Sequence, residues 1–112
     1  MGKLTCGEID QEMIIHNTTY SVAPPADAHW VSWVQEHHLP AVNALPGVSS
    51  CRFLKLLTEV ESDGITYTVQ TEIDTLPAAE EFLGKHDPRL QSLMTDAFPG
   101  QVLYFQTLLK VM

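Results

Sequence analysis

The chain has 112 residues, a formal net charge of −8 from fourteen acidic and six basic side chains, and 45% hydrophobic residues. These values are typical of one soluble globular domain with its own core. They disfavour binding to nucleic acid or to an anionic membrane surface, because both need clustered Lys and Arg. No apolar run approaches the ~18 residues of a membrane span, and the start of the chain lacks the apolar stretch of a signal peptide. Cys6 and Cys51 are too few for a disulfide framework. We therefore expect a cytoplasmic protein without a nucleic acid or membrane partner.

The first predicted element follows a segment without periodicity, residues 1–12, which is either a tail or an extra edge segment. Residues 13–22 (MIIHNTTYSV) are rich in β-branched and aromatic types, and this predicted strand stops at the breaker APP. Residues 26–45 show helical spacing and end at Pro46-Gly47. These residues therefore predict a strand followed by a helix.

The next two predicted elements are strands, at 48–60 and 65–73, and Asp63-Gly64 between them is a dipeptide typical of hairpin turns. Thr75 can cap a second helix. We expect this helix to break near Asp87-Pro88 and to restart there.

The last predicted element is a strand over residues 101–112. The order strand, helix, strand, strand, helix, strand predicts an α+β, ferredoxin-like βαββαβ plait. Its four-stranded antiparallel sheet carries the helices on one face. Residues 13–112 would form this single domain.

The last strand is apolar on both of its faces. One face holds Val102, Tyr104 and Leu108, and the other holds Leu103, Phe105, Leu109 and Val111. Helices cover only one face of such a sheet, and an apolar patch of this size rarely stays exposed to water. We therefore expect a homodimer in which two chains pack sheet against sheet.

The first predicted helix contains the adjacent histidines of the segment QEHHLPAV. Its apolar stripe consists of Trp30, Val34, His37, Ala41 and Leu45. At about 100° per residue, His37 points to the sheet and His38 is turned away. Pro40 lacks an N–H for the Glu36 carbonyl and should bend the helix. Neighbouring helical residues cannot converge on one ion, so no metal site is predicted. His37 is either a core histidine with one hydrogen bond or part of a ligand cavity, where a neutral imidazole could move a proton.

Further candidates lie on the predicted strands and on the same helix. The amide of Asn17, on a central strand, could face the helices, and Arg52 lies between apolar neighbours. Gln70 belongs to a polar row that is either a wet edge or part of a pocket. Trp30 and Trp33 are either core residues or a stacking wall for a planar ligand. The chain has no nucleotide-binding glycine motif, no Ser-His-Asp order and no CxxC, and no cofactor is expected.

Five stretches together, IIHNTTYSV, WVSWVQEHHLPAV, RFLKLL, TYTVQ and FQTLLKV, resemble an uncharacterised bacterial domain family. That family has an N-x-T first strand, W-x-x-W and H-x-P on the first helix, and a closing F-x-T-L-x-x-V strand. The family positions are held here by Asn17, Thr19, Trp30, Trp33, His38, Arg52 and Gln70. The resemblance covers about residues 13–112 and implies a ferredoxin-like, dimeric α+β barrel without an assigned activity.

The resemblance selects His38, whereas helix geometry favours His37. Both stay candidates, because a one-residue shift of the helix rotates its face by about 100°. Proteins similar in fold include cofactor-free monooxygenases, lactone isomerases, polyketide cyclases, haem-degrading enzymes and ligand-sensing domains, and fold alone does not transfer function.

The leading hypothesis is a homodimer that binds a small apolar or aromatic molecule between the first helix and the sheet. His37 or His38 with Asn17 would anchor this molecule, and Trp30 or Trp33 would form the wall. One alternative is a cofactor-free enzyme of monooxygenase, isomerase or cyclase type, with a histidine as general base. The other alternative is a structural dimer module without a ligand.

Overall fold

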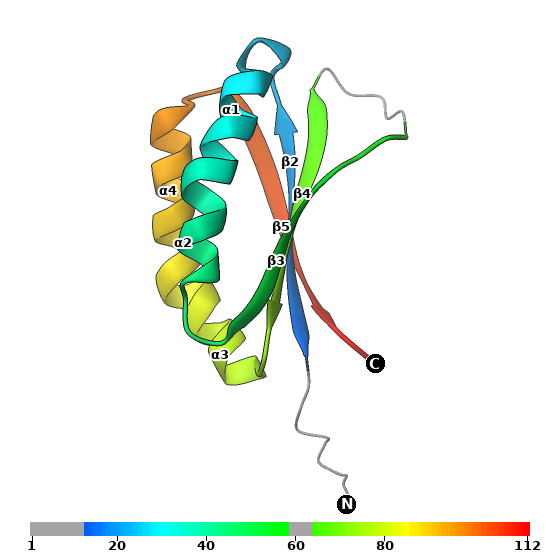
Figure 1. Cartoon of the computed structure of the whole chain (residues 1–112), viewed down its shortest axis with the longest axis vertical. Helices are drawn as coiled ribbons and strands as arrows, with labels where there is room; N and C mark the ends of the chain where they lie inside the picture. Colours follow the sequence, from blue (N-terminus) through cyan, green and yellow to red (C-terminus); the bar gives the residue numbers. More distant parts are fainter. Residues whose placement is uncertain (1–12, 59–63) are drawn as a thin grey trace, which may run out of the picture.

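The computed structural model describes residues 13–58 and 64–112, and in these ranges the chain forms two layers. One layer is an antiparallel sheet of order β3-β4-β2-β5, and the other consists of helices on one face of that sheet (Figure 1). The strands are β2 (Ile14–Val22), β3 (Val48–Lys55), β4 (Ile65–Ile73) and β5 (Val102–Lys110). The helical elements are η1 (Pro24–Ala26), α1 (Asp27–Trp33), η2 (Val34–His38), α2 (Leu39–Asn43), α3 (Leu76–Glu81), η3 (Phe82–His86) and α4 (Asp87–Ala97).

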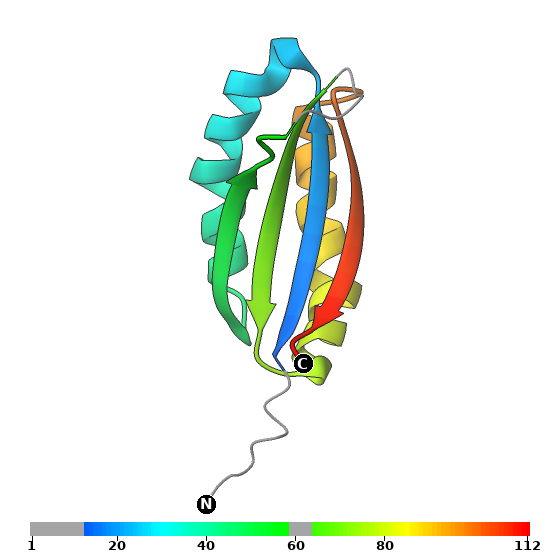
Figure 2. The same ribbon diagram turned by 90° about the vertical axis from the view of Figure 1, so that its right-hand side faces the viewer.

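The strand order places β2 and β4 in the middle of the sheet, with β3 and β5 at its edges (Figure 2). This arrangement confirms the ferredoxin-like α+β fold. The second strand ends earlier than predicted, at Lys55. The predicted segment 1–12, with Cys6, lies outside the described residues, and so does Asp63 of the predicted hairpin turn.

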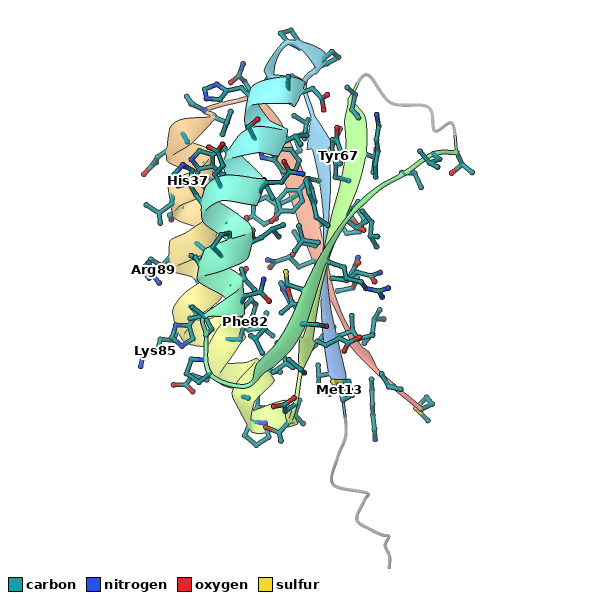
Figure 3. All side chains as sticks on the ribbon, in the orientation of Figure 1. Met13, His37, Tyr67, Phe82, Lys85 and Arg89 are labelled. Atoms are coloured by element: carbon teal, nitrogen blue, oxygen red, sulfur yellow. The ribbon has the colours of Figure 1, made fainter. Side chains whose placement is uncertain are left out.

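The β2 strand alternates strictly between buried and partly buried residues, because side chains point to opposite sheet faces in turn. The residues that face the helices are Ile14, His16, Thr18, Tyr20 and Val22. On the helix layer, Lys85 and Arg89 point away from the sheet (Figure 3).

Both long helical segments contain a π-helical turn directly before a proline. In η2 the N–H of Leu39 donates to the carbonyl of Val34, and in η3 the N–H of Asp87 donates to the carbonyl of Phe82. A proline clashes with the carbonyl four residues back in a regular α-helix, and the wider turn relieves that clash before Pro40 and Pro88. The predicted break at Asp87-Pro88 is therefore wrong, since the chain stays helical through it.

Local signals place the ends of the helices. The Thr75 side chain accepts a hydrogen bond from the N–H of Ala78 at 3.2 Å, which confirms the predicted cap of α3. Gly47 follows α2 with a φ of +82°, and a Cβ there would lie 2.7 Å from the Cβ of Ala78. Only glycine meets both demands at this turn. No helix within the described ranges is long and apolar enough to cross a membrane.

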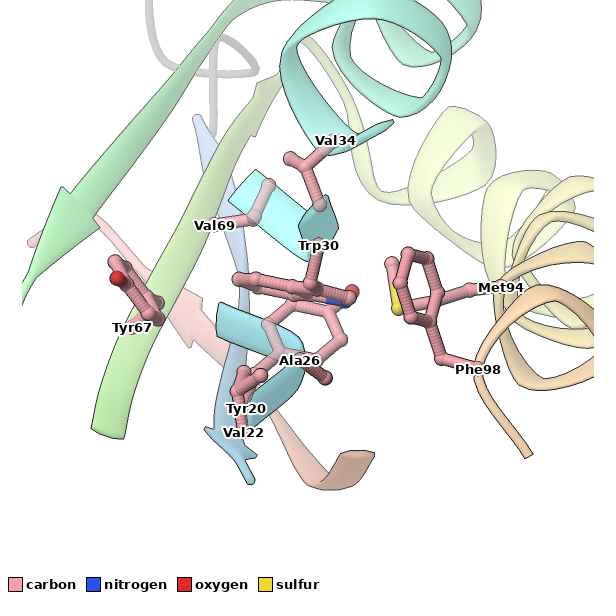
Figure 4. Packing of buried hydrophobic residues seen from close by; sticks show 9 residues of the cluster. All are labelled: Tyr20, Val22, Ala26, Trp30, Val34, Tyr67, Val69, Met94 and Phe98. Atoms are coloured by element: carbon pink, nitrogen blue, oxygen red, sulfur yellow. The ribbon is translucent and has the colours of Figure 1, made fainter. Parts of the chain in front are cut away.

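The core between the layers consists of two apolar clusters. The first surrounds Trp30, which packs against Tyr20 of β2 while Met94 of α4 and Phe98, directly after α4, lie on its other side (Figure 4). The second consists of Ile14, Val42, Ile73, Ala79, Phe82 and Leu90. The two clusters lie at opposite ends of β2, since Ile14 belongs to one and Tyr20 to the other.

Candidate functional site

The π-helical turn of η2 decides which histidine faces the sheet. His38 is buried with 4% exposure, whereas His37 is exposed. The buried residues recur at every fourth position, at Trp30, Val34, His38 and Val42. A regular α-helix has about 3.6 residues per turn, so the extra residue of the π turn moves the inward face from His37 to His38. The prediction from helix geometry that His37 points to the sheet is therefore wrong. The H-x-P resemblance selected His38, which is the buried residue.

A layer of buried polar side chains separates the two apolar clusters. It consists of His16, Thr18, His38, Thr71, Asp87 and Gln91. We call these six residues the polar layer. Its members come from β2, η2, β4 and α4, so every one of them depends on the tertiary fold for its neighbours. Cys51 of β3 borders the layer, with its Sγ 3.5 Å from the Thr71 Oγ1. Burial raises the pKa of the Cys51 thiol.

The carboxylate of Asp87 is the centre of a hydrogen-bond network in the layer. It accepts from the Nε2 of Gln91 at 3.1 Å and from the Nε2 of Gln106, on β5, at 2.6 Å. The Gln91 Nε2 also donates to the hydroxyl of Tyr20 at 2.9 Å. Burial raises the pKa of Tyr20, which therefore stays a neutral phenol at physiological pH. Both donors to Asp87 are neutral amides. Because they carry no positive charge, the carboxylate gives the layer a negative electrostatic potential.

The two buried imidazoles are weak bases. Burial lowers the pKa of His38 to about 4, although the nearby Asp87 carboxylate acts in the opposite direction. Burial likewise lowers the pKa of His16, again opposed by Asp87. The His38 imidazole is therefore uncharged at neutral pH, and a neutral imidazole can both donate and accept a hydrogen bond. The His16 ring also packs edge-on against Phe82, with centroids 5.0 Å apart.

Three ring nitrogens on the helix-facing side of the sheet are buried without a hydrogen-bond partner among the described residues. They are the Nε2 of His16, the Nδ1 of His38 and the Nε1 of Trp30. Buried polar atoms are nearly always satisfied by protein or by ordered water. The unsatisfied nitrogens therefore mark places where a group from outside the chain is expected to bind.

The two tryptophans differ in their surroundings. Trp30 is fully buried, with ring centroids 5.1 Å from Tyr20 and 5.2 Å from Tyr67. Trp33 is partly buried and contacts both histidines, at 5.7 Å from His37 and 6.4 Å from His38. Trp30 is thus a core residue with one unsatisfied N–H, and Trp33 lies at the edge of the core beside His38.

Three predicted site residues lie on the sheet face opposite the helices, which we call the open face. Asn17 points there because its neighbours His16 and Thr18 face the helices, so the predicted orientation of Asn17 is wrong. Gln70 is the register partner of Asn17 on β4, and Arg52 is the partner of Gln70 on β3. The Nη2 of Arg52 donates to the Oε1 of Gln70 at 3.1 Å. These residues form one group, separated from His38 by the sheet.

Two surface hollows, each of about 240 Å³, lie away from the polar layer. The first lies over β2 and β5 and is lined by Thr19, Tyr20, Ser21, Thr66, Leu103, Tyr104 and Phe105. The second lies at one end of the sheet, between Pro24, Gly64 and Gln101. Neither is lined by a member of the polar layer. Because all members are buried, an outside molecule reaches the layer only when helices and sheet part locally. Within the described residues, no group of three or more potential ligands is placed to hold a metal ion.

Sequence reasoning missed His16, Asp87 and Gln91. His86-Asp87-Pro88 repeats the spacing of His38-Leu39-Pro40, but the residue equivalent to His38 is the partly buried His86, so this motif does not point to Asp87. The period-2 pattern of β2 could have identified His16, because it places this residue on the same face as the apolar Ile14, Tyr20 and Val22.

Residues 13–112 match the family described as a domain of unknown function, DUF4286, and the chain belongs to this family. This finding confirms the resemblance to an uncharacterised domain family. A comparison with curated proteins finds no match.

Several solved structures are similar in fold. A conserved protein of unknown function from Bacteroides thetaiotaomicron has a TM-score of 0.66 and 9% identity, with 90% of this chain and 99% of that chain covered. SnoaB, a cofactor-independent oxygenase from Streptomyces nogalater, has a TM-score of 0.61 and 16% identity, with 90% and 94% covered. A DABB family protein with a ferredoxin-like fold from Mesorhizobium loti has a TM-score of 0.61 and 13% identity, with 87% and 96% covered. At these identities the likeness shows the fold alone.

Proposed function

We propose that this member of the DUF4286 family binds a small, largely apolar or aromatic molecule between its helices and its sheet, at the polar layer. The observation that carries the proposal is the pair of buried, unpartnered nitrogens of His16 and His38 in the layer, and the unpartnered Trp30 Nε1 lies in the adjoining first apolar cluster. Each unsatisfied buried group costs about 1–3 kcal/mol, so a molecule that supplies partners gains that free energy on binding. The apolar clusters on both sides of the layer favour a ligand body of the same character.

The charge of the layer restricts the kind of ligand that can bind there. Asp87 is buried with 5% exposure, and its carboxylate accepts hydrogen bonds from two neutral amides. An anionic group beside this carboxylate would be repelled in a medium of low polarity. The site therefore suits an uncharged molecule with hydroxyl or carbonyl groups. The π-helical turns η2 and η3 border the layer, and their wide hydrogen-bonding pattern is typical of functional sites.

Adjacent histidines supply a matched test of this site. The protein is purified under non-denaturing conditions and examined by native mass spectrometry, before and after addition of 2-naphthol as a neutral aromatic probe. We expect an adduct of one small molecule per chain in the parent protein and in His37→Ala, since His37 is exposed. His38→Ala should lose the adduct.

Two results would contradict the proposal. One is equal binding by His38→Ala and His37→Ala. The other is the absence of any adduct, with or without the probe, in a folded parent protein. Ordered water would then be the partner of the buried nitrogens.

A second candidate function is cofactor-independent proton abstraction by His38, whose imidazole is uncharged at neutral pH and whose low pKa of about 4 restricts it to acidic C–H bonds. Its free Nδ1 could form an N–H bond with an acidic hydrogen of the substrate while the electron pair of the broken C–H bond stays on the substrate as an enolate. The carboxylate of Asp87 would stabilise the resulting imidazolium. The fold shared with SnoaB is compatible with such chemistry.

Deuterium exchange tests this second candidate. In D₂O, the parent protein should accelerate loss of the acidic C–H signal of 2-tetralone, a neutral aromatic ketone, and His37→Ala should do the same. The loss should fall to the uncatalysed rate in His38→Ala. Exchange at the same rate with and without protein would contradict proton abstraction by His38. Ligand binding would then be the only function proposed for the layer.

A further inference from the structure

The indole N–H of Trp30 is a buried donor for which the described residues hold no acceptor. Trp30 is fully buried, and its Nε1 has no hydrogen-bond partner among them. Tyr20 and Tyr67 pack their rings against it (Figure 4). Their hydroxyls are bonded instead to Gln91 and Asp27. An indole N–H can only donate, so we expect an acceptor atom from outside the chain at this end of the interior.

The histidine end of the interior differs in the group that it suits. The Nε2 of His16 and the Nδ1 of His38 are buried without a partner in residues 13–58 and 64–112. A neutral imidazole nitrogen donates or accepts according to which ring nitrogen carries the proton, and a hydroxyl can serve either case. The Asp87 carboxylate near both rings favours a group that presents a positive hydrogen. A hydroxyl therefore suits this end.

A helix and a strand run side by side between the two ends. The helix turns Trp30, Val34 and His38 inward, and β2 turns Tyr20, Thr18 and His16 toward them. Tyr20 packs on Trp30, and His16 lies near His38, so the two rows correspond end to end. Eight helical residues rise about 12 Å, and four strand residues rise about 13 Å. The backbone positions of the two ends are thus about 12 Å apart.

We propose that the ligand is an aromatic hydroxy ketone that lies along this row, with its hydroxyl at His16 and His38 and its carbonyl oxygen on the Trp30 Nε1. This inference rests on the proposed function and adds the class of ligand and the residue that selects it. A hydrogen bond of about 2.9 Å at each end leaves about 6 Å between the two oxygens. Two fused rings with these groups at opposite ends provide such a separation, and the apolar Val34 suits the ring carbons.

Two probes that differ only in the carbonyl group test the Trp30 end. They are 6-hydroxy-1-tetralone and 6-hydroxytetralin. In isothermal titration calorimetry, the ketone should bind the parent protein about tenfold more tightly, because it supplies the missing acceptor. Trp30→Phe keeps an aromatic ring but removes the N–H, so it should bind both probes with the same affinity. Trp33→Phe is the matched control and should keep the preference of the parent, since Trp33 is only partly buried.

The indole N–H signals give a second measurement, which does not depend on the folding of Trp30→Phe. The chain has two tryptophans, so Trp33→Phe assigns the signal of Trp30 in a nitrogen–proton correlation spectrum. The ketone should shift the Trp30 signal downfield, because a new hydrogen bond to oxygen deshields the proton. The probe without the carbonyl should leave this signal in place.

The outcomes separate this inference from the proposed function. Equal affinity of the parent for the two probes, or a Trp30 signal that the ketone leaves unmoved, overturns the carbonyl contact while ligand binding at the polar layer stands. A preference for the ketone that folded Trp30→Phe retains also overturns the contact, since another donor must then hold the carbonyl. Binding of neither probe by the folded parent overturns both proposals.

Discussion

At the scale of single residues, the uncharged state of His38 is the property with the clearest consequence. Its imidazole is buried beside His16 and Asp87, and burial lowers its pKa from 6.5 to about 4. In the unfolded chain the same imidazole binds a proton near pH 6.5. The folded state therefore prefers the neutral form, and acid must favour unfolding.

We predict that this histidine makes the protein sensitive to mild acid. Its contribution is complete above about pH 6.5 and is lost as the pH falls toward 4, at a total of about 3 kcal/mol. Urea unfolding at several pH values between 7 and 4 measures the loss. His38→Phe should show a shallower dependence than the parent, whereas His37→Phe should match the parent. Equal slopes in all three proteins would contradict the assigned burial.

At the scale of elements, the two π-helical turns orient the polar layer. Each inserts one extra residue before a proline, and each turns one polar side chain, His38 or Asp87, toward the sheet. Removing the inserted residue would restore a regular helix. The helical segments before and after it would still turn the same side chains toward the sheet. The proline would then clash with the carbonyl four residues back, at a cost of about 3 kcal/mol.

We predict that deletion of the exposed Glu36 destabilises the protein by about 3 kcal/mol, and that adding Pro40→Ala to this deletion recovers most of the loss. Deletion of the exposed Ser92 in the regular part of α4 is the control. It rotates one flank of the helix by about 100° and should prevent folding. Urea denaturation measures all three, and a deletion of Glu36 that Pro40→Ala fails to rescue would contradict the role given to the proline.

At the scale of the whole molecule, side-chain hydrogen bonds connect the helix layer to the sheet. The hydroxyl of Tyr67, on β4, donates to the Asp27 Oδ1 at 2.6 Å, and Tyr20 on β2 is bonded to Gln91 of α4. The Tyr20 link is buried, whereas Asp27 is only partly buried. The two links should therefore differ in strength.

We predict that Tyr20→Phe costs about 1–3 kcal/mol, because it removes a buried partner of the Gln91 amide. Tyr67→Phe should cost less, about 1 kcal/mol, since Asp27 can bind water instead. Urea unfolding of the two variants at neutral pH gives both values. A larger loss in Tyr67→Phe would contradict the prediction that the buried Tyr20–Gln91 bond contributes more to stability than the partly buried Tyr67–Asp27 bond.

The sequence alone determined the order of the elements, the ferredoxin-like fold and the family. These follow from local signals: β-branched runs, helical periods and breakers such as Pro46-Gly47 act within about ten residues of one another. It also marked the last strand as apolar on both faces, and the structure leaves Leu103 and Phe105 exposed on one of these faces. Local patterns were sufficient to place the helices and strands along the chain, whereas the pairing of β2 with β4 and β5 is long-range and follows from the order of the elements.

Only the tertiary structure decided which side chains face the interior. The choice between His37 and His38 depended on a π turn that a regular helical period does not contain. The face of Asn17 depended on which side of β2 met the helices, and that is the side of Ile14, Tyr20 and Val22, which is more apolar than the side of Asn17. The polar layer joins residues from His16 to Gln91, far apart in the chain, and such contacts arise only when the helices pack on the sheet.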